Sequence, residues 1–192
     1  MNEVEDIGSS PNCSNAVVGS SVMKFKRVWA MPDSNTFNIL PIKQLIYKYI
    51  DKDKIWIDPF ARDGVFKSYC KFTNDLNTEF VCTHNMDAYD FLKTFETDSV
   101  DGVLFDPPYS LHQIVEKYQD YGGKQLKKVS ACYKEISRIL KPNGIAMHFG
   151  WNSNGCGANK MFQILEVLLV AHGGSHNDTI ITVERKFGGR LF

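Results

Sequence analysis

The stretch Ser99–Asp106 (SVDGVLFD), followed directly by Pro107-Pro108-Tyr109, decides the fold of this chain. It is a short apolar run that ends on a carboxylate. Two prolines then stop the strand, because proline lacks the N–H that a strand ladder needs. The stretch therefore predicts a buried strand whose carboxyl end carries Asp106.

Strands and helices alternate on both sides of this stretch. Further strands are predicted at Ile55–Asp58, Lys71–Asn77, Ile145–Gly150, Glu166–Ala171 and Thr179–Lys186. Helices are predicted at Pro41–Tyr49, Gly64–Cys70, Ala88–Phe95, Lys124–Leu140 and Asn159–Leu165. This alternation predicts an α/β fold, with a mostly parallel sheet that carries helices on both faces. The last two strands are expected to form an antiparallel C-terminal hairpin, since the turn between them is too short for a parallel crossover.

Length and composition favour one domain. The chain has 192 residues, the size of a single domain. Residues 1–21 are rich in Ser, Asn and Gly and are predicted to be a disordered tail, which leaves residues 22–192 as the domain. No apolar run approaches the roughly 20 residues of a membrane helix, and no stretch resembles a secretory signal. The five cysteines are scattered and form no C-x-x-C pair, so neither disulfides nor a metal site is predicted and a cytoplasmic location is expected.

Three of the predicted strands end on or near an acid, namely Asp58, Asp75 and Asp106. In sheets of this kind ligands bind beyond the carboxyl ends of the strands. We therefore expect all three carboxylates to face one cleft. Asp75 follows Asp58 by 17 residues, close to the about 20 that separate the phosphate-binding turn from the ribose-binding acid in dinucleotide-binding sheets.

The residue types in Asp106-Pro107-Pro108-Tyr109 suit the methylation of an exocyclic amine. Such an amine is a poor nucleophile, because its lone pair is delocalised into the base. A carboxylate and a backbone carbonyl that accept its two N–H groups stabilise the positive charge that develops on nitrogen. We expect Asp106 and the Pro107 carbonyl to hold the amine. Tyr109 would stack on the base, a contact worth about 1–3 kcal/mol.

The Asp106-Pro107-Pro108-Tyr109 sequence resembles the catalytic motif of the amino-group DNA methyltransferases, in particular the small phage-type enzymes that methylate N6 of adenine. Upstream, Asp58-Pro59-Phe60-Ala61-Arg62-Asp63-Gly64 resembles their cofactor motif. The resemblance covers about Trp29 to Lys186. It implies a Rossmann-like methyltransferase fold with seven strands, S-adenosylmethionine as cofactor, DNA as substrate and the cytoplasm of a bacterial or phage-infected cell as location. The cofactor-binding residues it implies are Asp58, Pro59, Phe60, Ala61, Gly64, Asp75, Asp87 and Ala88.

Asp87 and one further stretch of the chain each have a plain structural alternative to a cofactor role. An acid before a helix is often only its N-cap, and for Asp87 this alternative weighs as much as a cofactor contact. The stretch Phe37–Leu40, with Pro32 and Asn35 before it, is open to a cofactor-side role, although packing at the entry of a helix is the favoured reading.

The chain also departs from the family. Arg62 stands where the family usually has glycine, so its side chain would crowd the methionine end of the cofactor. We further expect no separate target-recognition domain, and only the segment between Tyr109 and Lys124 is long enough to serve as a substrate loop. A homodimer or a partner subunit is therefore expected to help supply specificity.

Alternatives to DNA adenine remain open at this point. Lysine plus arginine equals aspartate plus glutamate, giving a net charge of zero, which weighs against tight DNA binding by an isolated monomer. RNA, cytosine N4 and a protein glutamine are alternative acceptors. The enzymes that act on RNA or glutamine usually begin the motif with Asn, so Asp106 weighs against those two. A degenerate subunit that keeps the fold without catalysis is the third possibility.

Overall fold

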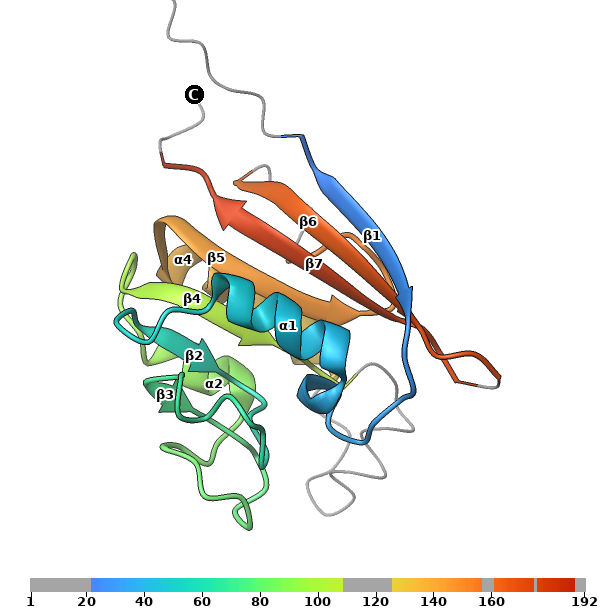
Figure 1. The fold of residues 1–192 in the computed structure, drawn as a ribbon. Helices are drawn as coiled ribbons and strands as arrows, with labels where there is room; N and C mark the ends of the chain where they lie inside the picture. The colour runs from blue at the N-terminus through green and yellow to red at the C-terminus, as the bar shows by residue number, and fades with distance from the viewer. Residues whose placement is uncertain (1–21, 109–125, 157–160, 175, 189–192) are drawn as a thin grey trace, which may run out of the picture.

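One sheet organises the part of the chain that the computed structural model describes, residues 22–108, 126–156, 161–174 and 176–188. In this part, seven strands lie in the order β1-β6-β7-β5-β4-β2-β3, as Figure 1 shows. Their bounds are β1 (Lys24–Trp29), β2 (Trp56–Asp58), β3 (Phe72–Thr73), β4 (Val100–Phe105), β5 (Leu140–Gly150), β6 (Phe162–Ala171) and β7 (Thr179–Lys186). β7 runs antiparallel to both of its neighbours, and all other pairs are parallel. The expected sheet and its C-terminal hairpin are confirmed.

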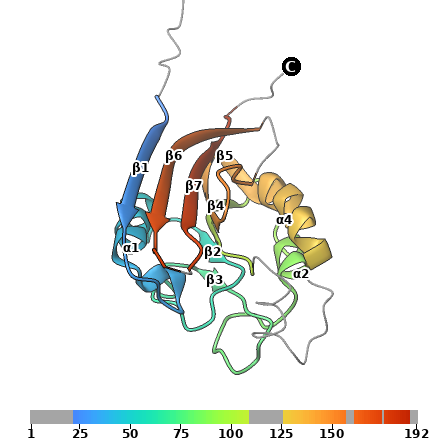
Figure 2. The ribbon, with the colours of Figure 1, turned by 90° about the vertical axis from the view of Figure 1, so that its right-hand side faces the viewer.

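Helices cover both faces of the sheet. The described helices are the 3-10 turn η1 (Thr36–Asn38), α1 (Leu40–Tyr49), α2 (Ala88–Lys93) and α4 (Leu126–Ile139). Figure 2 shows α1 on one side of the sheet and α2 and α4 on the other. None of the described helices is long and apolar enough to cross a membrane.

Each face of the sheet carries its own apolar core. α1 begins with Leu40-Pro41, and proline suits a first turn because its missing N–H would have no partner there. The helix buries Ile42, Leu45 and Ile46, spaced so that they lie on one side, against Trp56 and other residues of the sheet. On the other face α2 and α4 pack against β4 and β5. The central strand predicted from Ser99–Asp106 is β4, and all its residues but Asp101 are buried.

Two predicted helices are wrong. Residues 64–70 form successive turns, because the chain must enter β3 at once and Lys71 N already donates to Trp56 O. Residues 162–165 belong to β6, since pairing with β7 on one edge extends the strand from Phe162 onward. Residues 159–160 of that predicted helix lie outside the described residues.

The sequence reading also missed a strand. β1 pairs with β6 in parallel from Lys24 to Trp29 and forms an edge of the sheet. Its residues are exposed except for the half-buried Val28, so it lacks the buried apolar pattern by which strands are recognised. The predicted tail at residues 1–21 and the predicted substrate loop after Tyr109 lie outside the described residues.

Candidate functional site

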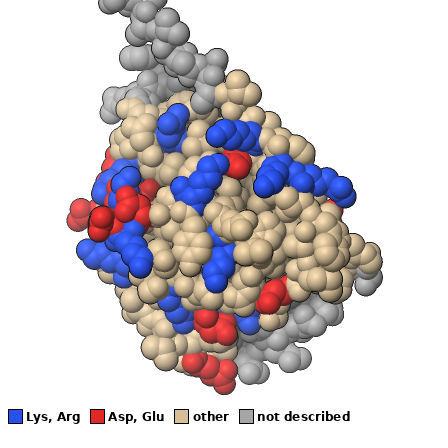
Figure 3. Space-filling model, viewed as in Figure 1, with Lys and Arg blue, Asp and Glu red and all other residues tan. Residues whose placement is uncertain are grey.

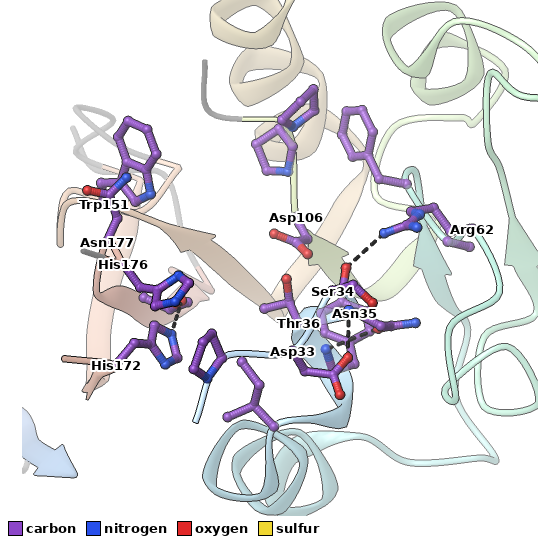
Figure 4. A pocket seen from close by; sticks show the side chains of 18 residues that line it. Asp33, Ser34, Asn35, Thr36, Arg62, Asp106, Trp151, His172, His176 and Asn177 are labelled. Atoms are coloured by element: carbon purple, nitrogen blue, oxygen red, sulfur yellow. Dashed lines mark hydrogen bonds between the residues drawn. The ribbon is translucent and has the colours of Figure 1, made fainter. Parts of the chain in front are cut away.

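Asp106 stands at the carboxyl end of β4 and opens onto a cleft of about 360 Å³. Figure 4 shows its carboxylate pointing into this cleft, toward Thr36. Pro107 and Pro108 also line the cleft, so three of the four predicted catalytic residues lie where a ligand would reach them. Tyr109 lies outside the described residues.

One wall of the cleft is the turn that follows β2, where Phe60, Ala61 and Arg62 line the cavity. Asp58 Oδ1 accepts the N–H of Phe60 at 3.0 Å and starts the turn. Gly64 N then donates to Ala61 O at 2.8 Å. A Cβ at position 64 would lie 2.8 Å from the same oxygen, so a glycine is required to close the turn this tightly.

The expectation that three carboxylates face the cleft holds for Asp106 only. Asp58 is 2% exposed and Asp75 is fully buried, and neither lines the cleft. Asp75 instead accepts the N–H of Arg62 at 3.1 Å and that of Asn77 at 2.9 Å, one on each oxygen. Both acids therefore stabilise the turn of residues 58–64, the cofactor-motif turn, from the side away from the cleft. Each carboxylate accepts a hydrogen bond from a backbone N–H of this turn. Their contacts with a cofactor stay predictions, as does that of Pro59, which is buried beside them.

Burial changes the ionisation of these two acids. It raises the pKa of Asp58 to about 8, against the hydrogen bond from Phe60 N, and the charges of Asp106 and Asp75 act in the same direction as burial. Burial also raises the pKa of Asp75, while the hydrogen bonds from Asn77 and Arg62 oppose it. Because β2, β3 and β4 are neighbours in the sheet, their carboxyl ends bring Asp75 and Asp106 close enough to Asp58 for their charges to raise its pKa.

Asn74 is a site residue that the sequence reading missed. It is fully buried, and its Nδ2 donates to Pro59 O and to Met86 O, both at 3.0 Å. Its Oδ1 accepts the N–H of Met86 at 3.1 Å. The side chain therefore ties the cofactor-motif turn to the segment before α2. Its only sequence signal was its place beside Asp75 at the end of a predicted strand.

Asp87 is the N-cap of α2. Its Oδ1 accepts the N–H of Tyr89 at 3.0 Å and that of Asp90 at 3.4 Å, the bonds expected of a helix cap. Ala88 is buried as the first residue of the helix. Neither residue lines the cleft, and the cofactor role implied for both stays a prediction.

A second wall comes from the segment before α1, where Asp33, Ser34, Asn35 and Thr36 line the cleft. Asn35 caps η1 by accepting the N–H of Phe37 at 3.2 Å. This segment meets the cofactor-motif turn directly, since Arg62 Nη1 donates to Ser34 O at 3.0 Å. The residues at the entry of α1 thus serve both helix packing, which was the favoured reading, and the lining of the cleft.

The far wall is built from the carboxyl ends of β5 and β6. Figure 4 shows Trp151, His172, His176 and Asn177 on the side of the cavity opposite Arg62. His172 is buried, with its Nδ1 at 2.9 Å from Ala30 O and its Nε2 at 2.9 Å from Thr179 Oγ1. Both ring nitrogens thus have protein partners, which fits a structural role. No local pattern indicated this wall, because its residues follow strands whose ends meet only in the folded sheet.

The cleft combines charged and apolar surface. Its described lining includes the carboxylates of Asp33 and Asp106, the guanidinium of Arg62, and apolar side chains such as Phe60 and Ile39. Its volume falls within the roughly 300–1,000 Å³ typical of small-molecule and cofactor sites. Such a lining suits a ligand that carries charges of both signs together with apolar parts.

Comparisons with known proteins identify the fold. No protein-family model matches the sequence, and no curated protein is significantly similar to it. Among solved structures, TrmN from Thermus thermophilus matches with a TM-score of 0.52 at 16% identity, over 78% of this chain and 49% of TrmN. The N-methyltransferase NodS from Bradyrhizobium japonicum, solved with S-adenosylhomocysteine, matches with a TM-score of 0.52 at 11% identity, over 80% of this chain and 89% of NodS. The chain thus has the Rossmann-like fold of S-adenosylmethionine-dependent methyltransferases.

Proposed function

We propose that this chain is an S-adenosylmethionine-dependent methyltransferase that acts on an exocyclic amine, with N6 of adenine in DNA as its acceptor. One observation carries the proposal. Asp106 and Pro107 stand together at the end of the central strand β4 and open onto a cleft, whose wall is the cofactor-motif turn. This is the place where sheets of this kind bind their ligands.

The lining of the cleft supports cofactor binding at this place. Phe60, Ala61 and Arg62 on one wall and the segment 33–37 on another would hold it, with Asp106 beside its reactive end. When bound, S-adenosylmethionine offers a methyl group on a positively charged sulfur. The carboxylates of Asp33 and Asp106 favour that positive charge, because opposite charges attract strongly in a partly dehydrated site.

Asp106 and Pro107 have the task of preparing the acceptor. The Asp106 carboxylate accepts one N–H of the amine and the Pro107 carbonyl accepts the other, which draws the nitrogen out of conjugation. The cofactor, once bound, would supply the methyl group to the nitrogen lone pair, and its sulfur would keep the electron pair of the broken bond as a neutral thioether. Asp106 would take the proton that the methylated nitrogen releases and pass it on to water. Tyr109 is assigned the stacking contact with the base.

DNA as the substrate requires local positive charge, since the net charge of the chain is zero. Figure 3 shows Lys and Arg side chains over the upper part of one face, where β1, β6 and β7 lie, with most acids at its left and lower margins. Lys24, Lys26 and Arg27 are exposed on β1. These charges support contact with phosphates, and a second subunit that adds specificity remains part of the proposal.

The proposal is tested by incubating the protein with S-adenosylmethionine and unmethylated single-stranded or duplex DNA, and reading the digested nucleosides by mass spectrometry. We expect N6-methyldeoxyadenosine, with a rate reduced by about 10²–10³-fold or more in Asp106→Ala. Asp53→Ala is the matched control. Asp53 is an exposed acid in the turn before β2 that does not line the cleft, so this variant should keep its activity.

Parallel incubations with RNA and protein decide between acceptors. Methylated RNA or glutamine, without methylated DNA, would keep the reaction and replace the substrate. N4-methyldeoxycytidine would move the acceptor to cytosine. A folded protein that binds no cofactor in calorimetry would contradict the enzyme and favour a non-catalytic subunit.

A further inference from the structure

Arg62 has a backbone conformation that an arginine rarely adopts. Its φ is 44°, in the left-handed region that glycine enters without cost. Asp75 holds the residue there by accepting its N–H at 3.1 Å. A strained residue persists at a turn when its surroundings impose it, and such residues gather at ligand sites. A glycine would adopt this conformation without strain, so what arginine adds at this position is its side chain.

The side chain is aimed into the cleft and held there. Its Nη1 donates to Ser34 O at 3.0 Å, and its guanidinium carbon lies 5.7 Å from the centre of the Phe80 ring. Figure 4 shows it reaching from its turn toward Ser34, on the side of the cavity opposite Trp151 and His172. A guanidinium has five N–H donors in a rigid fork, so the bond to Ser34 leaves donors for a bidentate partner.

The charges that line the cleft indicate which ligand group would bind the guanidinium of Arg62. Arg62 is the one Lys or Arg among the described residues that line the cavity, whereas Asp33 and Asp106 both line it. The ammonium and sulfonium groups of S-adenosylmethionine suit such an acidic site, but its carboxylate would be repelled. Arginine is the side chain whose fork matches a carboxylate in two parallel hydrogen bonds.

We propose that Arg62 binds the carboxylate at the methionine end of the cofactor, and that it makes this site select ligands that carry that group. The inference rests on the proposed function, and it replaces the expectation that an arginine in this turn crowds the methionine end. The positive φ at position 62 directs the side chain to its place, and Ser34 and Phe80 keep it there before the ligand binds.

Calorimetry on the full chain with two ligands tests the proposal. One ligand is S-adenosylhomocysteine, and the other is its decarboxylated analogue S-adenosyl-3-thiopropylamine, which keeps the amine. A charge-assisted pair of this kind corresponds to about 10- to 100-fold in affinity. We expect the wild type to prefer S-adenosylhomocysteine by about that factor. Arg62→Gly should bind S-adenosylhomocysteine more weakly by this factor and the decarboxylated analogue as tightly as the wild type does. Arg62→Lys should lose only part of the affinity for S-adenosylhomocysteine.

A matched control and separate outcomes keep the result decisive. Lys54→Ala removes an exposed cation in the turn before β2, outside the cleft, and should bind both ligands as the wild type does. A merely structural role for Arg62 would weaken both ligands equally in Arg62→Gly, and tighter binding of S-adenosylhomocysteine would mean that the guanidinium obstructs the site; either outcome overturns the inference. If Arg62→Gly does not fold, the two-ligand ratio in Arg62→Lys decides. A wild type that binds neither ligand would overturn the proposed function, whereas a wild type that binds both without preference would overturn only the role of Arg62.

Discussion

At the scale of single residues, Gly102 makes room for the largest side chain of the core. Gly102 of β4 pairs with Trp56 of β2, and Trp56 is 1% exposed. A Cβ at position 102 would lie 2.4 Å from two atoms of the indole ring. No contact that short is tolerated, and a closely packed interior has no free volume into which the ring can move.

Gly102→Ala should therefore destabilise the protein by about 1–3 kcal/mol or more, the usual cost of overpacking a core. The free energy of unfolding, measured by urea denaturation, tests this. In a Trp56→Leu background the added methyl meets a smaller neighbour, so the two substitutions together should cost less than the sum of the single costs. Additive costs would show that the indole ring is not what the alanine meets.

At the scale of elements, the short helix α2 depends on its cap. It has only six residues, Ala88–Lys93, and a helix of that length is not stable by itself. Asp87 satisfies two of its free N–H groups, and Phe91 and Leu92 anchor it in the core. The cap and the core contacts together keep α2 on the sheet.

Asp87→Ala should lower the free energy of unfolding by about 0.5–2 kcal/mol, since alanine does not cap. Asp87→Ser keeps a capping oxygen and should restore most of that loss. The pair also separates the two roles considered for this residue. If Asp87→Ser keeps wild-type stability but loses affinity for S-adenosylhomocysteine, Asp87 contacts the cofactor; if both are kept, it is a cap alone.

At the scale of the whole molecule, buried acids make stability depend on pH. Glu184 is 2% exposed, and it accepts the N–H of Cys156 at 2.6 Å. Burial raises its pKa to about 7, from an ordinary value of 4.5, against that hydrogen bond. The raised pKa means that folding favours the protonated acid. Between about pH 4.5 and 7 the folded chain keeps a proton that the unfolded chain has released, so stability falls as pH rises through this window.

Glu184→Gln removes this loss, because the amide stays neutral and its oxygen still accepts from Cys156. Relative to the wild type, the variant should gain up to about 3 kcal/mol of stability between pH 5 and pH 8. Urea denaturation at the two pH values measures the change. Other groups also make the stability depend on pH, because burial raises the pKa of Asp58 to about 8 and lowers that of His148 to about 4. The contribution of Glu184 is therefore the difference in stability between the variant and the wild type at each pH. Glu79→Gln, at an exposed position, is the control, and a similar gain there would remove Glu184 as the cause.

Patterns along the chain were enough to predict most of the sheet and the carboxyl end at which Asp106 lies. Apolar runs that end on Asp58 and Asp106, followed by prolines, are local signals, because strand burial and proline geometry act within a few residues. They located the central strands and the hairpin, and they placed Asp106 and Pro107 at a carboxyl end. The same local signals failed for residues 162–165 and for β1, where pairing with a neighbouring strand outweighed the pattern along the chain.

Which side chains line the cleft depends on tertiary packing instead. Asp58 and Asp106 look equivalent in sequence, yet one is buried under its turn and the other opens onto the cleft. The cleft itself joins segments near residues 34, 61, 107 and 177 that no local rule connects. Burial and charge depend on contacts between such distant segments, so the exposure of Asp106, the support from Asn74 and the orientation of Arg62 follow from the packing of the whole sheet.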